Sequence, residues 1–196
     1  MRLKNKIAII TGAGSGFGKG IAIRFAEEEA KVVIVDINID SAEKVALEIG
    51  KNALAIKCDV SQDGDVASLF EQTLEQFGSA DILVNNAGTT HRNKPMTEVT
   101  EKEFDQIFAV NVKSVFLTAK HGVPLMKKKG QGVILNVAST AGQRPRPGLT
   151  WYNTSKGAMI TATKAMAIEL ATFKIRVNAI NPVAGETGML HLFMGE

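Results

Sequence analysis

A tyrosine and a lysine lie four residues apart in the segment W-Y-N-T-S-K-G, at Tyr152 and Lys156. In a helix this spacing places both side chains on one face, with Cβ atoms about 5–6 Å apart. A phenol ordinarily titrates near pH 10, and an ammonium group about 4 Å away, at an effective dielectric constant near 20, stabilises the phenolate by roughly 4 kcal/mol. The pair is therefore suited to proton transfer near neutral pH. An ordinary pair on a solvated helix face has the same spacing, so other residues must distinguish the two interpretations.

Ser139 stands at the end of a predicted strand, in the run I-L-N-V-A-S, and Tyr152 opens the helix predicted after it. Ligands of parallel α/β sheets bind where strands end and helices begin, so the two hydroxyls are expected at one site. The chain has no histidine placed to activate Ser139 as a nucleophile, and no G-x-S-x-G turn. We therefore predict that Ser139 orients a reacting oxygen, with a plain turn residue as the alternative.

Short apolar runs of strand length recur along the chain and alternate with longer segments of helical period. The runs cover residues 7–10, 32–35, 53–56, 82–84, 133–137 and 177–180. Continuous apolar strands that alternate with helices indicate a parallel sheet buried on both faces. We predict one α/β domain over residues 1–196, a doubly wound Rossmann-type sheet with strand order 3-2-1-4-5-6. The chemistry is expected at the carboxyl ends of its strands.

A glycine-rich turn, T-G-A-G-S-G-F-G, follows the first predicted strand and precedes an amphipathic helix. Its spacing is T-G-x-x-x-G-x-G through Gly12, Gly16 and Gly18, and the G-x-G-x-x-G spacing does not fit. A helix that begins here would present free backbone N–H groups to a pyrophosphate, and glycine leaves room for the approach. We predict that a dinucleotide binds at this turn, against Ser15 and Phe17 as well as the glycines.

The second predicted strand, V-V-I-V, ends at Asp36. A carboxylate at this position can accept hydrogen bonds from the adenosine ribose hydroxyls and would repel a 2′-phosphate. Lys19 and Arg24 are nearby, but neither stands just after the strand, where a phosphate-binding arginine is expected. The pattern favours NAD over NADP, with a loop acid or helix cap as the alternative for Asp36.

Composition excludes several classes of protein. With 196 residues, 45% hydrophobic and 22% charged, the chain is suited to a globular domain, and a net charge of +3 gives no nucleic-acid signal. A single cysteine, Cys58, excludes a disulfide within the chain and fits a reducing compartment. The sequence has no signal peptide and no membrane-spanning run, so the expected location is the cytoplasm. His91, His121 and His191 lack a ligand spacing such as H-E-x-x-H, so no metal site is predicted.

Taken together, these motifs resemble the short-chain dehydrogenase/reductase family, from residue 7 to about 187. The resemblance depends on their joint order and spacing. The matching segments are T-G-x-x-x-G-x-G at 11–18, Asp36, Asp59-Val60, Asn85-Asn86-Ala87-Gly88, Asn111, Ser139, Tyr152-x-x-x-Lys156 and Asn181-Pro182. The usual P-G of the last motif is Pro182-Val183 in this chain.

The resemblance implies a role for each matching residue. Tyr152 is the general acid or base, Ser139 holds the reacting oxygen, and Lys156 lowers the pKa of Tyr152 and binds the nicotinamide ribose. Asn111 holds a water that links Lys156 to solvent. The remaining cofactor contacts it implies are Asp59 with Val60 at the adenine, Asn86, Ala87 and Gly88 along the cleft, and Pro182 with Thr187 at the nicotinamide.

Two arginines, Arg144 and Arg146, lie in the proline-containing loop between Ser139 and Tyr152. Arginine offers a planar fork suited to carboxylate or phosphate. An anionic or phosphopantetheine-bearing substrate is one hypothesis. Solvated arginines or an ion pair between subunits are equally compatible with the sequence.

The function predicted is NAD-dependent hydride transfer between nicotinamide and a secondary alcohol or ketone. Within the family the chain resembles 3-oxoacyl carrier-protein reductases and alcohol or sugar dehydrogenases. The alternatives are an NADPH-dependent 3-oxoacyl carrier-protein reductase and a non-catalytic dinucleotide sensor. By the resemblance, the helices expected at about 101–121 and 152–172 pair between subunits in a homodimer or homotetramer. The family normally continues past this chain with a seventh strand, and residues 183–196 correspond to the substrate lid, so the polypeptide is expected to be longer.

Overall fold

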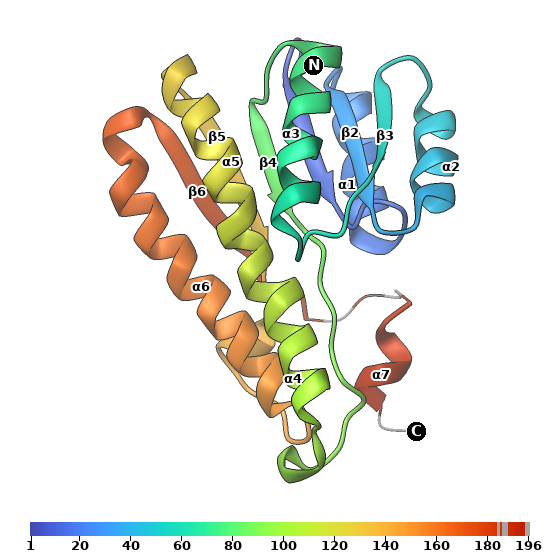
Figure 1. Ribbon diagram of the computed structural model, residues 1–196, viewed down its shortest axis with the longest axis vertical. Coiled ribbons are helices and arrows are strands. Elements are labelled where there is room, and N and C mark those ends of the chain that lie inside the picture. The colour runs from blue at the N-terminus through green and yellow to red at the C-terminus, as the bar shows by residue number, and fades with distance from the viewer. Residues whose placement is uncertain (184, 186–187, 195–196) are drawn as a thin grey trace.

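The sheet of this computed structural model is parallel and has six strands (Figure 1). The structure describes residues 1–183, 185 and 188–194. The strand order is β3-β2-β1-β4-β5-β6, as predicted, and each predicted apolar run lies within a strand. The strands are β1 Ile7–Thr11, β2 Lys31–Asp36, β3 Ala53–Lys57, β4 Ile82–Asn85, β5 Gly132–Val137 and β6 Ile175–Ile180.

Helices pack on both faces of the sheet, whose central strands are apolar on both sides. Alternate residues of β1 point in opposite directions, so Ile9 belongs to one buried cluster while Ala8 and Ile10 belong to the other. The helices that flank the sheet are α1 Gly16–Glu27 and α2 Ile39–Ile49 on the side of Ala8, and α3 Asp63–Phe77, α5 Ser114–Lys129 and α6 Thr150–Leu170 on the side of Ile9.

The helix predicted from about 101 to 121 is interrupted. Helix α4 (Glu101–Phe108) begins with a capping box formed by Thr100 and Glu103. A π-helical turn, Ala109–Lys113, then joins it to α5. Single π turns inside helices often occur at functional sites, and this one contains Asn111.

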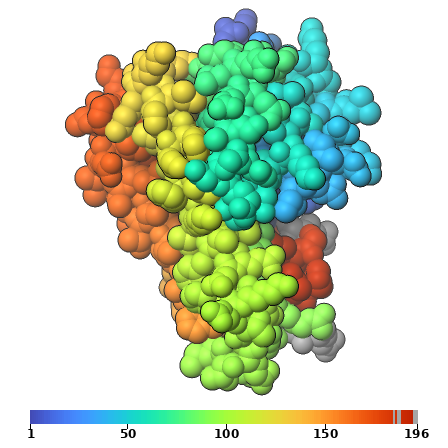
Figure 2. Space-filling model, viewed as in Figure 1, coloured from blue at the N-terminus to red at the C-terminus, as the bar shows by residue number. Residues whose placement is uncertain are grey.

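The described residues also form three short 3-10 turns and one further helix. The turns are Met96–Glu98, Thr140–Gly142 and Ala171–Phe173, and the helix is α7, Leu190–Met194. Helix α7 lies beyond the carboxyl ends of the strands, beside the segment that joins β4 to α4 (Figures 1 and 2). The backbone N–H of Asn93 in this segment donates to the carbonyl of Leu192 at 2.9 Å. No helix in the described part of the chain is long and apolar enough to cross a membrane.

Candidate functional site

A cleft of about 590 Å³ opens at the carboxyl ends of the strands. It brings together most of the residues that the sequence predicted for the site: Gly12, Ser15, Gly16, Phe17, Asp36, Asp59, Val60, Asn86, Ala87, Gly88, Ser139, Arg146, Tyr152, Lys156 and Pro182. Gly18, Asn111 and Arg144 do not line it, and Thr187 lies outside the described residues.

The glycine turn has a shape that side chains would block. Gly12 has a φ of +61°, and a Cβ there would lie 2.9 Å from Cα of Ala87. A Cβ at Gly18 would overlap the carbonyl oxygen of Gly12. Helix α1 begins at Gly16, and the Ser15 hydroxyl does not cap it. The first-turn N–H groups have no partner within the helix, so the turn fits a pyrophosphate.

Thr11 and Asn86 attach this turn to the end of β4. Asn86 donates from Nδ2 to the carbonyls of Thr11 and Gly12, at 2.8 and 3.0 Å. The Thr11 hydroxyl accepts from the backbone N–H groups of Asn86 and Ala87, each at 3.0 Å. The turn is therefore held in place by side chains from two adjacent strands. The sequence indicated Asn86 only as a lining residue, and it assigned no function to the hydroxyl of Thr11.

The carboxylate of Asp36 is oriented by backbone donors. Its Oδ2 accepts from the N–H of Gly14 at 2.9 Å, and its Oδ1 accepts from the N–H of Asn38 at 3.0 Å. An ionised carboxylate has about four acceptor positions, so two remain for ribose hydroxyls. Lys19 is paired with Glu48 at 2.8 Å.

Asp59 and Val60 form the next part of the cleft wall, after β3. The Oδ1 atom of Asp59 accepts hydrogen bonds from the N–H and the hydroxyl of Ser61, at 2.9 and 2.7 Å. Val60 is buried. The residues present at this end of the cleft thus offer acceptors and an apolar surface, which fits an adenosine group.

Ser139, Tyr152 and Lys156 are buried together at the other end of the cleft. Ser139 follows β5, and its hydroxyl accepts from the N–H of Ala141 at 3.1 Å. Tyr152 lies in the first turn of α6, and Lys156 is one turn later. The Nζ atom of Lys156 donates to the carbonyl of Val137 at 2.9 Å and lies 5.9 Å from the centroid of the Tyr152 ring.

Burial and two neighbouring residues influence the pKa of Tyr152. Burial raises it above its ordinary value, while a hydrogen bond with Ser139 and the charge of Arg146 act in the opposite direction. Lys156 directs its ammonium group at a backbone carbonyl, and burial lowers the pKa of this lysine to about 8. Burial is thus the largest influence on the pKa of Tyr152, and a lowering of this pKa by Lys156 stays a prediction.

Asn111 connects the segment after β4 to helix α6. It is fully buried in the π-helical turn, where Oδ1 accepts from the N–H of Thr89 at 2.8 Å. Its Nδ2 donates to the carbonyl of Thr89 and to the hydroxyl of Ser155, both at 2.9 Å. The two N–H groups of the Asn111 side chain are thus both used within the protein, so they are not available to hold the water that the resemblance implies. The resemblance pointed to Asn111, but no sequence signal indicated its partner Ser155.

Helix α7, which lies within the segment that the resemblance assigned to the substrate lid, forms one wall of the cleft. The ring of Phe193 meets the ring of Tyr152 edge to face, with centroids 5.2 Å apart. Leu190 and Met189 line the same part of the cleft, and Leu149 is buried beside Tyr152. The phenol is therefore shielded from water by apolar groups.

Lys156 should make the stability of the cofactor-free protein depend on pH. Because burial lowers the pKa of Lys156 from its ordinary value of 10.5 to about 8, the unfolded chain binds this proton more readily than the native protein. The free energy of unfolding should therefore rise with pH above about 8, by up to about 1.4 kcal/mol per pH unit.

Denaturant unfolding of the parent and of Lys156→Met, between about pH 8 and pH 9, tests this dependence. We expect the rise in the parent and a smaller one in the variant. At higher pH the raised pKa values of Tyr152 and Cys58 act in the opposite direction, since the unfolded chain loses those protons first. Identical pH dependence in the two proteins would show that the pKa of Lys156 is not lowered in the native protein.

Comparison with known proteins agrees with this geometry. The family model described as short chain dehydrogenase matches residues 6–193. The chain is 48% identical to the 4-formylbenzenesulfonate dehydrogenase of Comamonas testosteroni, across 100% of this chain and 79% of that relative. It is 41% identical to the galactitol 2-dehydrogenase of Agrobacterium fabrum, across 93% of this chain and 71% of that relative.

A solved structure shows the same fold. The crystal structure of 3-ketoacyl-(acyl-carrier-protein) reductase from Brucella melitensis, complexed with NADH, has a TM-score of 0.97 and 54% identity. The match covers 98% of this chain and 81% of that chain. This protein therefore belongs to the short-chain dehydrogenase/reductase family of NAD(P)-dependent oxidoreductases.

Proposed function

We propose that the protein is an NAD-dependent dehydrogenase that transfers hydride between nicotinamide and a secondary alcohol or ketone. The observation that carries the proposal is the burial of Ser139, Tyr152 and Lys156 together in a cleft whose other end holds the glycine turn and Asp36. A dinucleotide sensor would need the turn and the acid, but it would not need a serine, a tyrosine and a lysine at the reacting end.

Tyr152, Ser139 and Lys156, at that end of the cleft, have different roles in the proposed reaction. When bound, the nicotinamide accepts the carbon-bound hydrogen of the alcohol with its electron pair at C4, or returns it to a carbonyl. Tyr152 takes the hydroxyl proton in oxidation and gives it back in reduction, as a general base or acid. Ser139 donates a hydrogen bond to the same oxygen and stabilises its developing charge. Lys156 holds the nicotinamide ribose, and its charge favours the phenolate.

The preference for NAD is supported by Asp36. A carboxylate fixed by two backbone N–H groups accepts from ribose hydroxyls and repels a phosphate at the same place. The Brucella melitensis reductase was solved with NADH, which agrees with this choice of cofactor. The similar proteins carry names that cover an aldehyde, a sugar alcohol and a ketoacyl thioester, so they support the reaction class more than any one substrate.

The test is formation of NADH from NAD, followed by absorbance with a panel of alcohols, sugars, hydroxysteroids and 3-hydroxyacyl thioesters. We expect turnover with at least one class, and a kcat about 10²- to 10⁴-fold lower with Tyr152→Phe. If NADPH and a 3-oxoacyl thioester are used far better, the protein is the biosynthetic type of reductase. Tight NAD binding without turnover across the panel would support the sensor instead.

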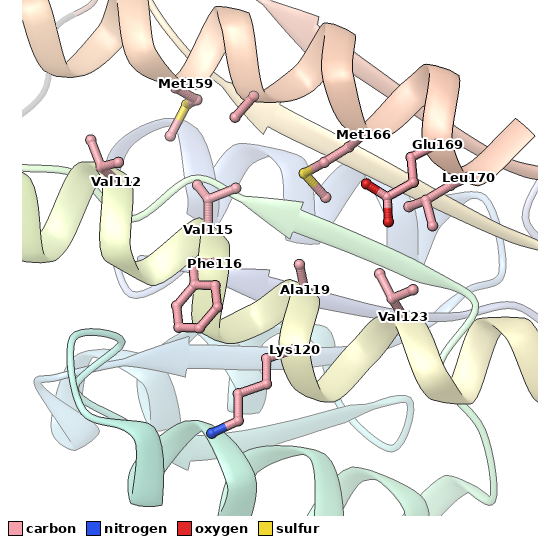
Figure 3. Close-up of a pocket in the computed structure, with 11 residues that line it drawn as sticks. Val112, Val115, Phe116, Ala119, Lys120, Val123, Met159, Met166, Glu169 and Leu170 are labelled. Carbon is pink, nitrogen blue, oxygen red and sulfur yellow. The ribbon is translucent and has the colours of Figure 1, made fainter.

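We also propose that a second copy of the chain covers a groove between α5 and α6. The groove has a volume of about 420 Å³ (Figure 3). Val115 and Ala119 of α5 and Met159 and Met166 of α6 line it, and Phe116 on its edge is 62% exposed. Family members usually oligomerise, and an exposed phenylalanine beside an apolar groove is suited to a subunit interface.

Phe116→Glu is therefore expected to shift the protein toward monomer, because the interface would have to bury a charge. Light scattering after size exclusion gives the mass of the particle. The matched control is Leu47→Glu on α2, since Leu47 is 85% exposed and does not line the groove. An unchanged mass for Phe116→Glu would place the interface elsewhere.

A further inference from the structure

Beside the reacting tyrosine, the cleft wall includes an exposed arginine, Arg146. We propose that Arg146 is the subsite for an anionic group of the substrate, such as a carboxylate or a sulfonate, at the end of the molecule away from the reacting carbon. The substrate class is then an alcohol or ketone with an apolar body and a terminal anion. The inference depends on the dehydrogenase function proposed above.

The charges along the cleft are divided between its two ends. Asp36 and Asp59 lie at the ends of β2 and β3, where the adenosine is expected. Among the described lining residues, the positive charges are Lys156 and Arg146, at the end near β5 and α6. Lys156 is only 4% exposed and is bound to the carbonyl of Val137. A substrate anion at this end therefore meets Arg146.

The guanidinium of Arg146 is available to a ligand. No carboxylate in the described part of the chain lies within ion-pair distance of it, in contrast to Arg2 and Arg24, which are both paired with Glu28. Arg144 is also exposed, but it does not line the cleft. The sequence could not distinguish the two arginines, but in the structure only Arg146 lines the cleft.

The backbone that carries Arg146 is held from two sides. Its carbonyl accepts from Nδ2 of Asn153 on α6 at 2.8 Å. The carbonyl of the next residue, Pro147, accepts from Nδ2 of Asn93 at 3.2 Å. Gly148, at a φ of +75°, accepts from the N–H of Lys94 at 3.1 Å. A charged group on a fixed backbone loses less entropy when it binds a ligand, so the subsite is pre-organised at its base.

Part of the cleft wall near Tyr152 is apolar. Leu149, Leu190 and Phe193 line the cleft near Tyr152, and they offer no hydrogen bond from their side chains. A polar sugar would leave its hydroxyl groups unpaired against them. A substrate with an apolar body can bury it there while its anion binds the guanidinium, which holds carboxylates and sulfonates through two parallel hydrogen bonds.

The subsite is tested by binding, with a pair of secondary alcohols that differ in charge but hardly in shape: 4-(1-hydroxyethyl)benzoate and 4-(1-hydroxyethyl)benzamide. Calorimetry with the NADH-loaded protein, in which neither alcohol can be oxidised, gives both dissociation constants. We expect the parent to prefer the anion, and Arg146→Gln to weaken anion binding by about 10- to 100-fold. Binding of the amide should not change.

Two controls separate this subsite from general surface charge. Arg144→Gln removes the same charge from the same loop outside the cleft and should leave both constants unchanged. The preference of the parent for the anion should decrease at high salt, because Arg146 is exposed. Equal anion binding by the parent and Arg146→Gln, or no measurable anion binding by the parent, would overturn the subsite.

Turnover of the same two alcohols distinguishes failure of the Arg146 subsite from failure of the proposed dehydrogenase function. If the parent oxidises alcohols but Arg146→Gln changes kcat/KM equally for the acid and the amide, the subsite is wrong and the dehydrogenase stands. If the anion binds through Arg146 but no alcohol of the panel yields NADH, the dehydrogenase is wrong and the subsite stands.

Discussion

Tyr152→Phe is expected to lower kcat by about 10²- to 10⁴-fold and to leave NAD affinity nearly unchanged. The substitution removes only the hydroxyl that exchanges a proton with the substrate oxygen, and the ring keeps its contact with Phe193. The glycine turn and Asp36, where we propose that the dinucleotide binds, lie at the opposite end of the cleft. A large decrease in kcat with nearly unchanged NAD affinity is therefore the expected result if Tyr152 is a general acid or base.

Turnover and NAD binding should be measured on the same preparation, with circular dichroism to confirm the fold. Ser139→Ala is the companion variant, because it removes a hydrogen bond to the substrate oxygen and leaves the proton donor in place. We expect it to lose activity while its NAD affinity also stays close to that of the parent. Activity of Tyr152→Phe within tenfold of the parent would remove Tyr152 from the catalytic role, since proton transfer by a positioned group contributes about 10²-fold or more.

The sheet was predictable because its physical cause is local. A strand covered on both faces must be apolar at every position, so the runs at 7–10 and 32–35 identify strands without any knowledge of their neighbours. The π-helical turn at Ala109–Lys113 was not predictable in this way. A π turn differs from an α-helix in its i→i+5 backbone hydrogen bonds, and the side chain of Asn111 within it is held by Thr89 and Ser155, which lie far away in the sequence.

The site was predictable to the extent that strand ends meet at one edge of a parallel sheet. This rule places Asp36, Asn86 and Ser139 in a common cleft. It does not specify the direction in which a long side chain extends. The bond from Lys156 to the carbonyl of Val137 and the separation of Arg146 from Arg144 depend on tertiary contacts. The pKa of Tyr152 is a further example, because burial depends on segments far away in the sequence.

Asp36→Ala is expected to change the ratio of kcat/KM for NAD to that for NADP by at least about 100-fold. Two effects add. The variant loses charge-assisted hydrogen bonds to the ribose hydroxyls, each of which contributes about 1.5–3 kcal/mol. It also loses the repulsion between a carboxylate and a 2′-phosphate. The affinity for NAD should therefore fall while the affinity for NADP rises.

The comparison needs a control for the structural role of this carboxylate, because Asp36 accepts from the N–H groups of Gly14 and Asn38. Asp36→Asn keeps one side-chain acceptor for these groups and removes the charge, so it should shift the cofactor ratio in the same direction with less effect on stability. Asp40→Asn on α2 removes an exposed charge that does not line the cleft, and it should leave the ratio unchanged. If Asp36→Ala kept the preference for NAD, the carboxylate would not be the group that selects the cofactor, and its two backbone hydrogen bonds would be its whole function.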